Sequence, residues 1–284
     1  MERIYEKNLV EIFRVTPNVF FRKGNLRIRH QCNGAFLVSG DTVAAVDVPS
    51  MEAAQEMMDE SAELFGLPIR YVFLTHGDAD HVEGLPLFLD QPVTVFCSHR
   101  LIGQLAPEGT SHKAAFVGVD GVLRLRIGAL DIELSTIQGT AHSPRDMFIR
   151  LLREQILCTG DTAVEFQTLY YHAADVENWI VTLRDLYARG GQSILPGHGE
   201  VYPYSHLDAV ADFMETVLRA ARKCMEPLSR DEILGLEEVK INEMAAKYYS
   251  AGGADAVTIR EKAGEDAERE LRMVIQALVR KLQQ

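Results

Sequence analysis

Long apolar runs are missing from this sequence of 284 residues. None approaches the roughly 20 consecutive apolar residues that a membrane-spanning helix requires. The first residues, MERIYEKNLVEIF, are charged from the second position onward and lack the apolar core of a signal peptide. We therefore expect no membrane partner and no export.

Cysteine and positive charge are also scarce. The four cysteines lie far apart without a CxxC pair, which excludes a zinc knuckle and a dense disulfide framework and favours a cytoplasmic protein. Lys and Arg number 29 against 41 Asp and Glu, which gives a formal net charge of -12. Such an acidic chain repels phosphate backbones, so nucleic acid is not an expected partner.

Residues 12–204 alternate between strand-like and helix-like segments. Short runs rich in branched and aromatic residues, bounded by turn residues, predict strands. The clearest are VFF, GAFLV, TVAAVDV, IRYVFLT, VTVFC, VLRLRI, LDIELSTI, DMFIRLL and QSILP. Apolar residues at helical spacing predict helices in SMEAAQEMMDESAELF and VENWIVTLRDLYAR, each followed by glycine. This order predicts an α/β fold built from two similar halves.

The character of the chain changes after Tyr204, where strand signals almost disappear. Two apolar stripes at helical spacing lie within 210–221 and 271–282, and Ser229 with Glu232 fits a capping box at a helix start. We predict an α/β domain at 1–204 and a helical C-terminal extension at 205–284. The extension would pack on the domain, form a lid over the site or provide a homodimer interface.

Four separated strand-like runs are followed by residues that bind metals. They are His76, Asp78, Asp80 and His81 in THGDADH, His142 in GTAHSP, Asp161 in CTGDT, and His198 in LPGHG. In a layered α/β fold the loops at the ends of strands meet at one edge, so we expect these seven side chains to converge there. Imidazole nitrogens and carboxylate oxygens bind zinc at about 2.0 to 2.2 Å, and two metals can jointly activate a water molecule.

These motifs, in this order and in these contexts, resemble the metallo-β-lactamase fold superfamily. Its usual first motif is HxHxDH. After this motif come, in order, a lone His, an Asp in a GD context and a His in PGHG. The resemblance covers about residues 12–204. It implies an αββα sandwich of the metallo-β-lactamase type, with the site at one edge and two divalent metal ions in most members.

The resemblance also implies a role for each matching residue. His76 and His142 would serve the first metal. Asp80, His81 and His198 would serve the second metal, and Asp161 would bridge the two. Asp80 would in addition orient the attacking nucleophile, which makes it the predicted catalytic residue.

Asp78 departs from the family pattern because it replaces the second histidine of the first motif. As a direct ligand it would leave a dinuclear centre with a bridging hydroxide formally neutral, whereas a histidine would leave one positive charge. An added oxygen ligand favours iron or manganese relative to zinc. The short reach of aspartate leaves a second interpretation, in which Asp78 contacts its metal through water and the first site is weak.

Other residues near these motifs have mainly structural interpretations. Asp47 lies where the family commonly has an aspartate that supports the ligand loop, and Thr75 is expected to brace the same loop. Packing is the favoured role for Tyr170 and Tyr171, with donation to a developing oxyanion as the alternative. Arg145 is expected at the solvated surface, with binding of a substrate carboxylate as the alternative.

These observations predict a metal-dependent hydrolase of small-molecule substrates. A metal-activated hydroxide would attack an ester, lactone, thioester or related bond, and no GxSxG motif suggests a serine nucleophile instead. Two alternatives stay open. Asp78 motivates a non-haem iron oxidoreductase of the same fold, similar to flavodiiron proteins or sulfur dioxygenases. The other alternative is a non-catalytic metal-binding module.

Overall fold

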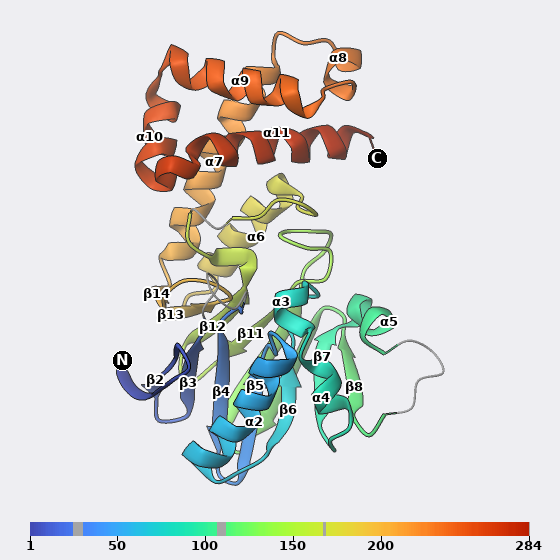
Figure 1. Ribbon diagram of the computed structural model, residues 1–284, viewed down its shortest axis with the longest axis vertical. Coiled ribbons are helices and arrows are strands. Elements are labelled where there is room, and N and C mark those ends of the chain that lie inside the picture. Colours follow the sequence, from blue (N-terminus) through green and yellow to red (C-terminus); the bar gives the residue numbers. More distant parts are fainter. Residues whose placement is uncertain (25–30, 107–111, 167–168, 284) are drawn as a thin grey trace. The chain divides into compact units, whose positions relative to one another are not determined.

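The fold contains two β-sheets (Figure 1). The computed structural model describes residues 1–24, 31–106, 112–166 and 169–283. Eight strands in chain order make the first sheet, and six strands in the order β14-β13-β12-β11-β10-β9 make the second. The predicted α/β class with a helical C-terminal region is confirmed.

The first sheet is antiparallel in its first half and parallel in its second half. Its strands are β1 (Glu2–Lys7), β2 (Val10–Thr16), β3 (Val19–Lys23), β4 (Gly34–Ser39), β5 (Thr42–Val46), β6 (Ile69–Phe73), β7 (Thr94–Ser98) and β8 (Ala115–Val119). Neighbours from β1 to β5 pair antiparallel, and neighbours from β5 to β8 pair parallel. The change to parallel pairing requires crossover segments, and α2 (Met51–Phe65) is the first of these.

The second sheet is mostly antiparallel. Its strands are β9 (Val122–Ile127), β10 (Leu130–Thr136), β11 (Met147–Leu151), β12 (Ile156–Gly160), β13 (Ser193–Pro196) and β14 (Tyr202–Pro203). The pairing of β12 with β13 is parallel, as is that of β5 with β6 in the first sheet. Loops at the carboxyl ends of such parallel strands are the usual place for a site in an α/β fold.

Apolar side chains lie on both faces of the first sheet. Phe21 and Leu37 belong to a core cluster that also includes Leu134 and Ile149 of the second sheet, so this cluster lies between the sheets. Residues one position away along the same strands, such as Phe36, belong to another cluster with side chains of the helices α2 and α4 (Leu85–Leu89). This separation follows from the alternation of side chains along a strand.

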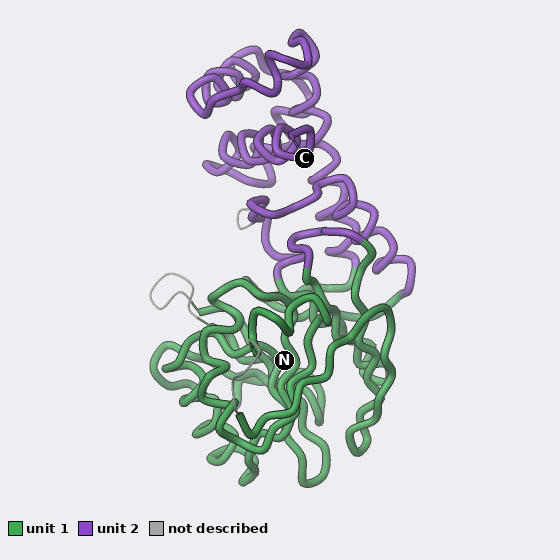
Figure 2. Tube along the Cα trace, turned by 90° about the vertical axis from the view of Figure 1, so that its right-hand side faces the viewer, with its two compact units in different colours: residues 1–138, 145–160, 190–204 green, residues 139–144, 161–189, 205–284 purple. Residues whose placement is uncertain are grey.

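The described chain divides into two compact units (Figure 2). The first unit comprises 1–138, 145–160 and 190–204, and it contains both sheets. Its helical segments are α2, α3 (Ala79–Val82), α4, the 3-10 turn η1 (His99–Leu101) and α5 (Ile102–Leu105). Ser50 caps α2, and Gly66 ends it in a left-handed conformation, in agreement with the predicted stop at glycine.

The second unit comprises 139–144, 161–189 and 205–284, and it is helical. Its elements are η2 (Asp161–Ala163), α6 (Val176–Ala188), α7 (His206–Met225), α8 (Arg230–Leu234), α9 (Glu238–Ala251), α10 (Ala254–Ala263), η3 (Gly264–Asp266) and α11 (Ala267–Gln283). The capping box of Ser229 and Glu232 is present at the start of α8. Among the described residues, no helix combines the length and the apolar content that crossing a membrane requires.

Candidate metal centre

Asp47 anchors the loop that carries the first motif. It follows β5, and its φ of 55° lies in the left-handed region, which aspartate tolerates better than most residues. One of its carboxylate oxygens accepts a hydrogen bond from Thr75 N at 2.8 Å, and the other accepts one from Thr75 Oγ1 at 2.8 Å. Its carboxylate also lies 2.8 Å from His81 Nδ1. Asp47 is only 2% exposed, so these contacts are shielded from water.

These contacts determine which nitrogen of each histidine carries the proton. A carboxylate accepts hydrogen bonds, so His81 donates from Nδ1 and keeps a lone pair on Nε2. Thr75 Oγ1 gives its proton to Asp47, so at 3.0 Å it accepts from His76 Nδ1. His76 therefore also keeps its lone pair on Nε2. Both imidazoles are in the tautomer that binds a metal through Nε2.

Carboxylates approach these Nε2 atoms. Asp78 Oδ2 lies 3.6 Å from His76 Nε2, and Asp80 Oδ2 lies 3.9 Å from His81 Nε2. Asp80 Oδ2 also lies 3.1 Å from Nε2 of His198, which follows β13. Ligand atoms bound at about 2.1 Å in a tetrahedral arrangement lie roughly 3.4 Å apart. The spacing of these pairs therefore fits donors that share a metal ion.

Asp78 and Asp80 lie at the start of the short helix α3. Asp78 is its N-cap residue, but its side chain makes no capping hydrogen bond to the helix. The Asp78 side chain is 45% exposed and that of Asp80 is 30% exposed, whereas His76 and His81 are buried. The carboxylates thus lie on the solvent side of the two imidazoles, where a substrate would arrive.

Glycine is required beside this loop at Gly160, the last residue of β12. Its φ of +51° lies in the left-handed region. A Cβ atom at this position would lie 2.6 Å from Thr75 Oγ1 and 3.2 Å from His76 Nδ1. Any side chain here would push apart the hydrogen bonds that orient His76.

His142 and Asp161 belong to the second unit. His142 Nδ1 lies 3.1 Å from the carbonyl oxygen of Tyr170, to which it must donate, so its lone pair is also on Nε2. That Nε2 atom lies 4.0 Å from Asp161 Oδ2. The seven predicted ligands thus fall into two groups, with five in the first unit and two in the second. Their roles as ligands stay predictions.

Helix α6 positions both predicted ligands of the second unit. Asn178 donates from Nδ2 to Thr140 O at 2.8 Å and so holds the loop that carries His142. The fully buried ring of Trp179 contacts the His142 ring edge-on, with centroids 5.4 Å apart. Trp179 Nε1 donates to the carbonyl oxygen of Thr162 at 2.8 Å, next to Asp161. One aromatic side chain therefore supports both ligands.

The sequence prediction did not include Asn178 or Trp179. The single tryptophan of the chain was a usable signal, because it lies on an amphipathic helix between the Asp161 and His198 motifs.

Helix α11 in turn holds α6 and the segment before it. Lys281 Nζ binds Asp175 at 2.8 Å and Glu177 at 2.6 Å, and Arg280 donates to Tyr171 O at 2.7 Å. Within this unit, the C-terminal helix is part of the support of His142.

The remaining named residues have the surroundings of structural groups. Tyr171 is fully buried and packs on Trp179, and Tyr170 is 46% exposed. Arg145 donates to Gln104 Oε1 at 2.6 Å. Cys32 lies close to Asp47 and His81, but burial raises the pKa of its thiol to about 12. Without a bound metal ion it is therefore a neutral thiol near pH 7.

The histidine and carboxylate donors fit a divalent metal ion. Asp80, His81 and His198 offer ligand atoms that all lie within 4.8 Å of one another. A set of two imidazoles and one carboxylate is typical of sites for zinc and for iron(II). A carboxylate commonly orients a metal-bound histidine by accepting a hydrogen bond from its other ring nitrogen, and Asp47 is placed to do so for His81.

The chain is similar in sequence to known proteins. A sequence profile of the Metallo-beta-lactamase superfamily matches residues 29–198. Atrochrysone carboxyl ACP thioesterase AacuM of Aspergillus aculeatus is 24% identical over 233 residues, and the match covers 78% of this chain and 68% of that protein. A protein of Aspergillus versicolor that is named as a transcription factor, avaE, is 28% identical over 133 residues. That match covers 41% of this chain and 40% of avaE, so the chain spans less than half of that relative.

A solved structure has the same architecture. The metallo-β-lactamase from Pontibacter korlensis aligns with a TM-score of 0.63 at 18% identity, over 72% of this chain and 99% of that chain. At this identity the likeness concerns the fold, and it confirms the predicted αββα sandwich. Because the family profile also covers more than half of the sequence, the chain belongs to the metallo-β-lactamase superfamily.

Proposed function

We propose that this hydrolase cleaves an acyl ester, thioester or lactone of a small-molecule substrate. Two divalent metal ions would be held by the seven predicted ligands. The thioester is the favoured bond, because AacuM is named as a thioesterase. That match covers 78% of the chain, whereas residues 1–204 make up 72% of it, so the likeness reaches into the helical region.

The common tautomer of three histidines carries this proposal. His76, His81 and His142 each donate from Nδ1, to a hydroxyl, a carboxylate and a carbonyl oxygen respectively. Each therefore keeps an Nε2 lone pair, and each Nε2 lies within 4.0 Å of an aspartate oxygen. A histidine that binds a metal through one ring nitrogen commonly donates the N–H of the other to such an acceptor.

The residues of the chain would divide the work of hydrolysis. When bound, the metal ions would lower the pKa of a water molecule and polarise the scissile carbonyl group. Asp80 would accept a hydrogen bond from the attacking water and orient it, since its carboxylate is partly exposed beside His198. Asp47 and Thr75 would hold His76 and His81 in position without contacting the substrate.

Substrate and metal are tested together. The metal-depleted protein and protein reloaded with zinc, manganese or iron(II) are assayed with an N-acetylcysteamine thioester, an aryl ester, a lactone and a phosphodiester. We expect hydrolysis of an acyl compound that chelation removes and a divalent metal restores. Acyl hydrolysis that persists without metal, or turnover of the phosphodiester alone, would contradict the proposal.

The Asp78→His substitution tests the metal preference. It would replace an anionic oxygen ligand by an imidazole and so favour zinc over manganese or iron. After loading from an equimolar mixture of the three ions, the ratio of bound zinc to bound manganese should rise by about 10-fold. Replacing a residue at a metal site commonly changes metal affinity by about this factor. Asp120→His, at an exposed position between β8 and β9, is the matched control. An unchanged metal content and pH profile would refute direct ligation by Asp78.

A non-haem iron oxidoreductase is the second candidate. The observation that favours it is the Asp78 carboxylate beside His76 Nε2, because a ligand set richer in oxygen suits iron. Elemental analysis of protein purified without added metal separates the two candidates. Iron together with consumption of oxygen would favour the oxidoreductase, and zinc without oxygen consumption would eliminate it.

The expected compartment and partners complete the proposal. All four cysteines carry free thiols, which is compatible with a reducing cytoplasm. A small molecule is the proposed partner, without nucleic acid or membrane. The division at residue 204 and a homodimer through the helical extension stay predictions.

A further inference from the structure

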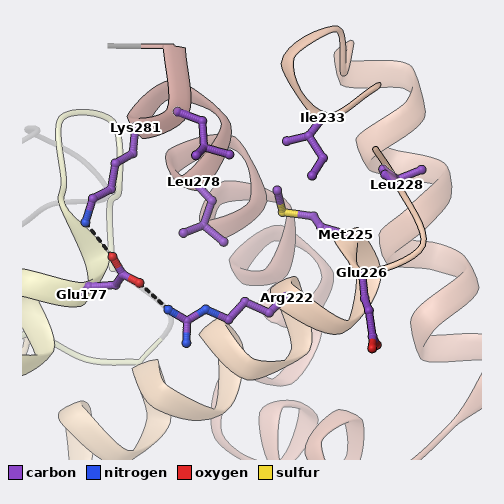
Figure 3. Close-up of a pocket in the computed structure, with 9 residues that line it drawn as sticks. Glu177, Arg222, Met225, Glu226, Leu228, Ile233, Leu278 and Lys281 are labelled. Carbon is purple, nitrogen blue, oxygen red and sulfur yellow. Dashed lines mark hydrogen bonds and ion pairs between the residues drawn. The ribbon is translucent and has the colours of Figure 1, made fainter. Parts of the chain in front are cut away.

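The second unit contains a cavity of about 560 Å³ between α7, α8 and α11 (Figure 3). Its apolar lining consists of Met225, Leu228, Ile233, Leu278 and Leu282. Cavities of roughly 300 to 1,000 Å³ with apolar walls and a few polar groups are usual for small-molecule sites, and about 150 Å³ suffices for benzene. The volume therefore suits a chain or ring system of more than six carbon atoms.

The polar side of this cavity has no net charge. Glu177 and Glu226 contribute two negative charges, and Arg222 and Lys281 contribute two positive charges. Glu177 lies between the two cations and accepts hydrogen bonds from both (Figure 3). Both cations already face a carboxylate, so an anionic ligand would find no free positive charge here, and the lining favours an uncharged ligand over an anion.

The cavity shares a helix with the support of the candidate metal centre. Glu177, in its wall, directly precedes Asn178, which holds the His142 loop. Lys281, also in its wall, binds Asp175, the residue that caps α6. Within one compact unit, the cavity and the two predicted ligands thus depend on the same helix start.

We propose that this cavity binds the uncharged acyl chain of the substrate. The proposal rests on the proposed function for the acyl class, and on the apolar lining, the volume and the charge balance for the site itself. It assigns medium-chain and longer acyl compounds to the enzyme in place of acetyl compounds. Ile233 would be a specificity-determining residue, because its half-buried side chain closes the cavity from α8.

Binding of 2-decanone, an uncharged ketone that cannot be hydrolysed, tests the site without catalysis. Calorimetry should detect saturable binding to the full chain. Ile233→Asn should weaken this binding by at least about 10-fold, because an apolar contact in a pocket contributes on that scale. Val239→Asn is the control, since Val239 is a 68% exposed apolar residue of the same unit outside the cavity. Absence of binding, or equal binding to Ile233→Asn and the unchanged protein, would overturn the site.

Kinetics with two thioesters connect the site to the substrate. Ile233→Asn should raise KM for decanoyl-N-acetylcysteamine by about 10-fold and raise the ratio of this KM to that for acetyl-N-acetylcysteamine, whereas Val239→Asn should change neither KM. Loss of 2-decanone binding with an unchanged KM for the decanoyl thioester would overturn the assignment to the substrate chain. A chain that binds 2-decanone but hydrolyses no acyl compound under any metal would instead refute the proposed function. The two failures are therefore distinguishable.

Discussion

Replacing Asp80 with asparagine is expected to lower kcat/KM for the best acyl substrate by about 10³-fold, which corresponds to roughly 4 kcal/mol of transition-state stabilisation. In the unchanged protein the Asp80 carboxylate lies 3.1 Å from His198 Nε2. Asparagine preserves the shape of the side chain and a contact with this nitrogen. It removes the negative charge that binds a metal ion and orients the attacking water. We expect metal content to fall together with kcat, while the thermal unfolding midpoint of the metal-depleted protein changes little.

Asp120→Asn is the matched control for this substitution, because Asp120 is an exposed aspartate of the same unit. It should leave kcat/KM and metal content unchanged. If Asp80→Asn kept kcat/KM within 10-fold of the unchanged protein with full metal content, Asp80 would be neither ligand nor orienting residue. The second alternative, a non-catalytic module, would gain support if no substitution among the seven predicted ligands altered any hydrolysis that is found.

The elements that could be predicted from the sequence are those with hydrophobic spacing of their own and residues that mark their ends. Helix α2 was predictable because its apolar residues have helical spacing and Gly66 marks its end. Strand β1 was not predicted, since ERIYEK has no apolar face and its side chains are largely exposed. It pairs with β2 at the edge of the sheet, where Arg3 binds Glu11 at 2.5 Å and Arg14 binds Glu2 at 3.1 Å. A strand that is held in this way by its partner strand shows no alternation of apolar residues in its own sequence.

The candidate site was predictable only as a set of residues. The motifs name His142, but they do not reveal that Asn178 and Trp179 hold its loop or that Lys281 holds the start of α6. The contact between Lys281 and Asp175 joins segments that lie more than a hundred residues apart in the sequence. The tautomer of His76 likewise depends on whether the Thr75 hydroxyl donates or accepts, which only the position of Asp47 decides.

The helical unit contains a buried carboxyl group that should make its stability depend on pH. Glu270 of α11 is fully buried, and burial raises the pKa of its carboxyl from 4.5 to about 8. Arg269, with Nη1 3.9 Å away, and the Tyr171 hydroxyl oppose this rise, while Asp266 adds to it. In the unfolded chain the same carboxyl ionises near 4.5. Between these two values the folded state therefore keeps a proton that the unfolded state has lost.

The direction of the effect follows from this difference in bound protons. The contribution of protonated Glu270 is fully present below pH 4.5 and is lost as pH rises through about 8. The free energy of unfolding should therefore fall by roughly 3 to 5 kcal/mol across this range because of Glu270 alone. Glu270→Gln, which has no proton to lose, should abolish this fall and be more stable than the unchanged protein near pH 8.

Fluorescence of Trp179, the single tryptophan, can follow unfolding of this unit by urea at pH 5 and pH 8. Glu268→Gln is the control, because Glu268 is an exposed glutamate of the same helix. Its unfolding free energy should change with pH as that of the unchanged protein does. Equal pH dependence in Glu270→Gln and the unchanged protein would mean that Glu270 is ionised in the folded state. Since Tyr171 packs on Trp179 and Trp179 on His142, a looser helical unit at high pH should also weaken metal binding through His142.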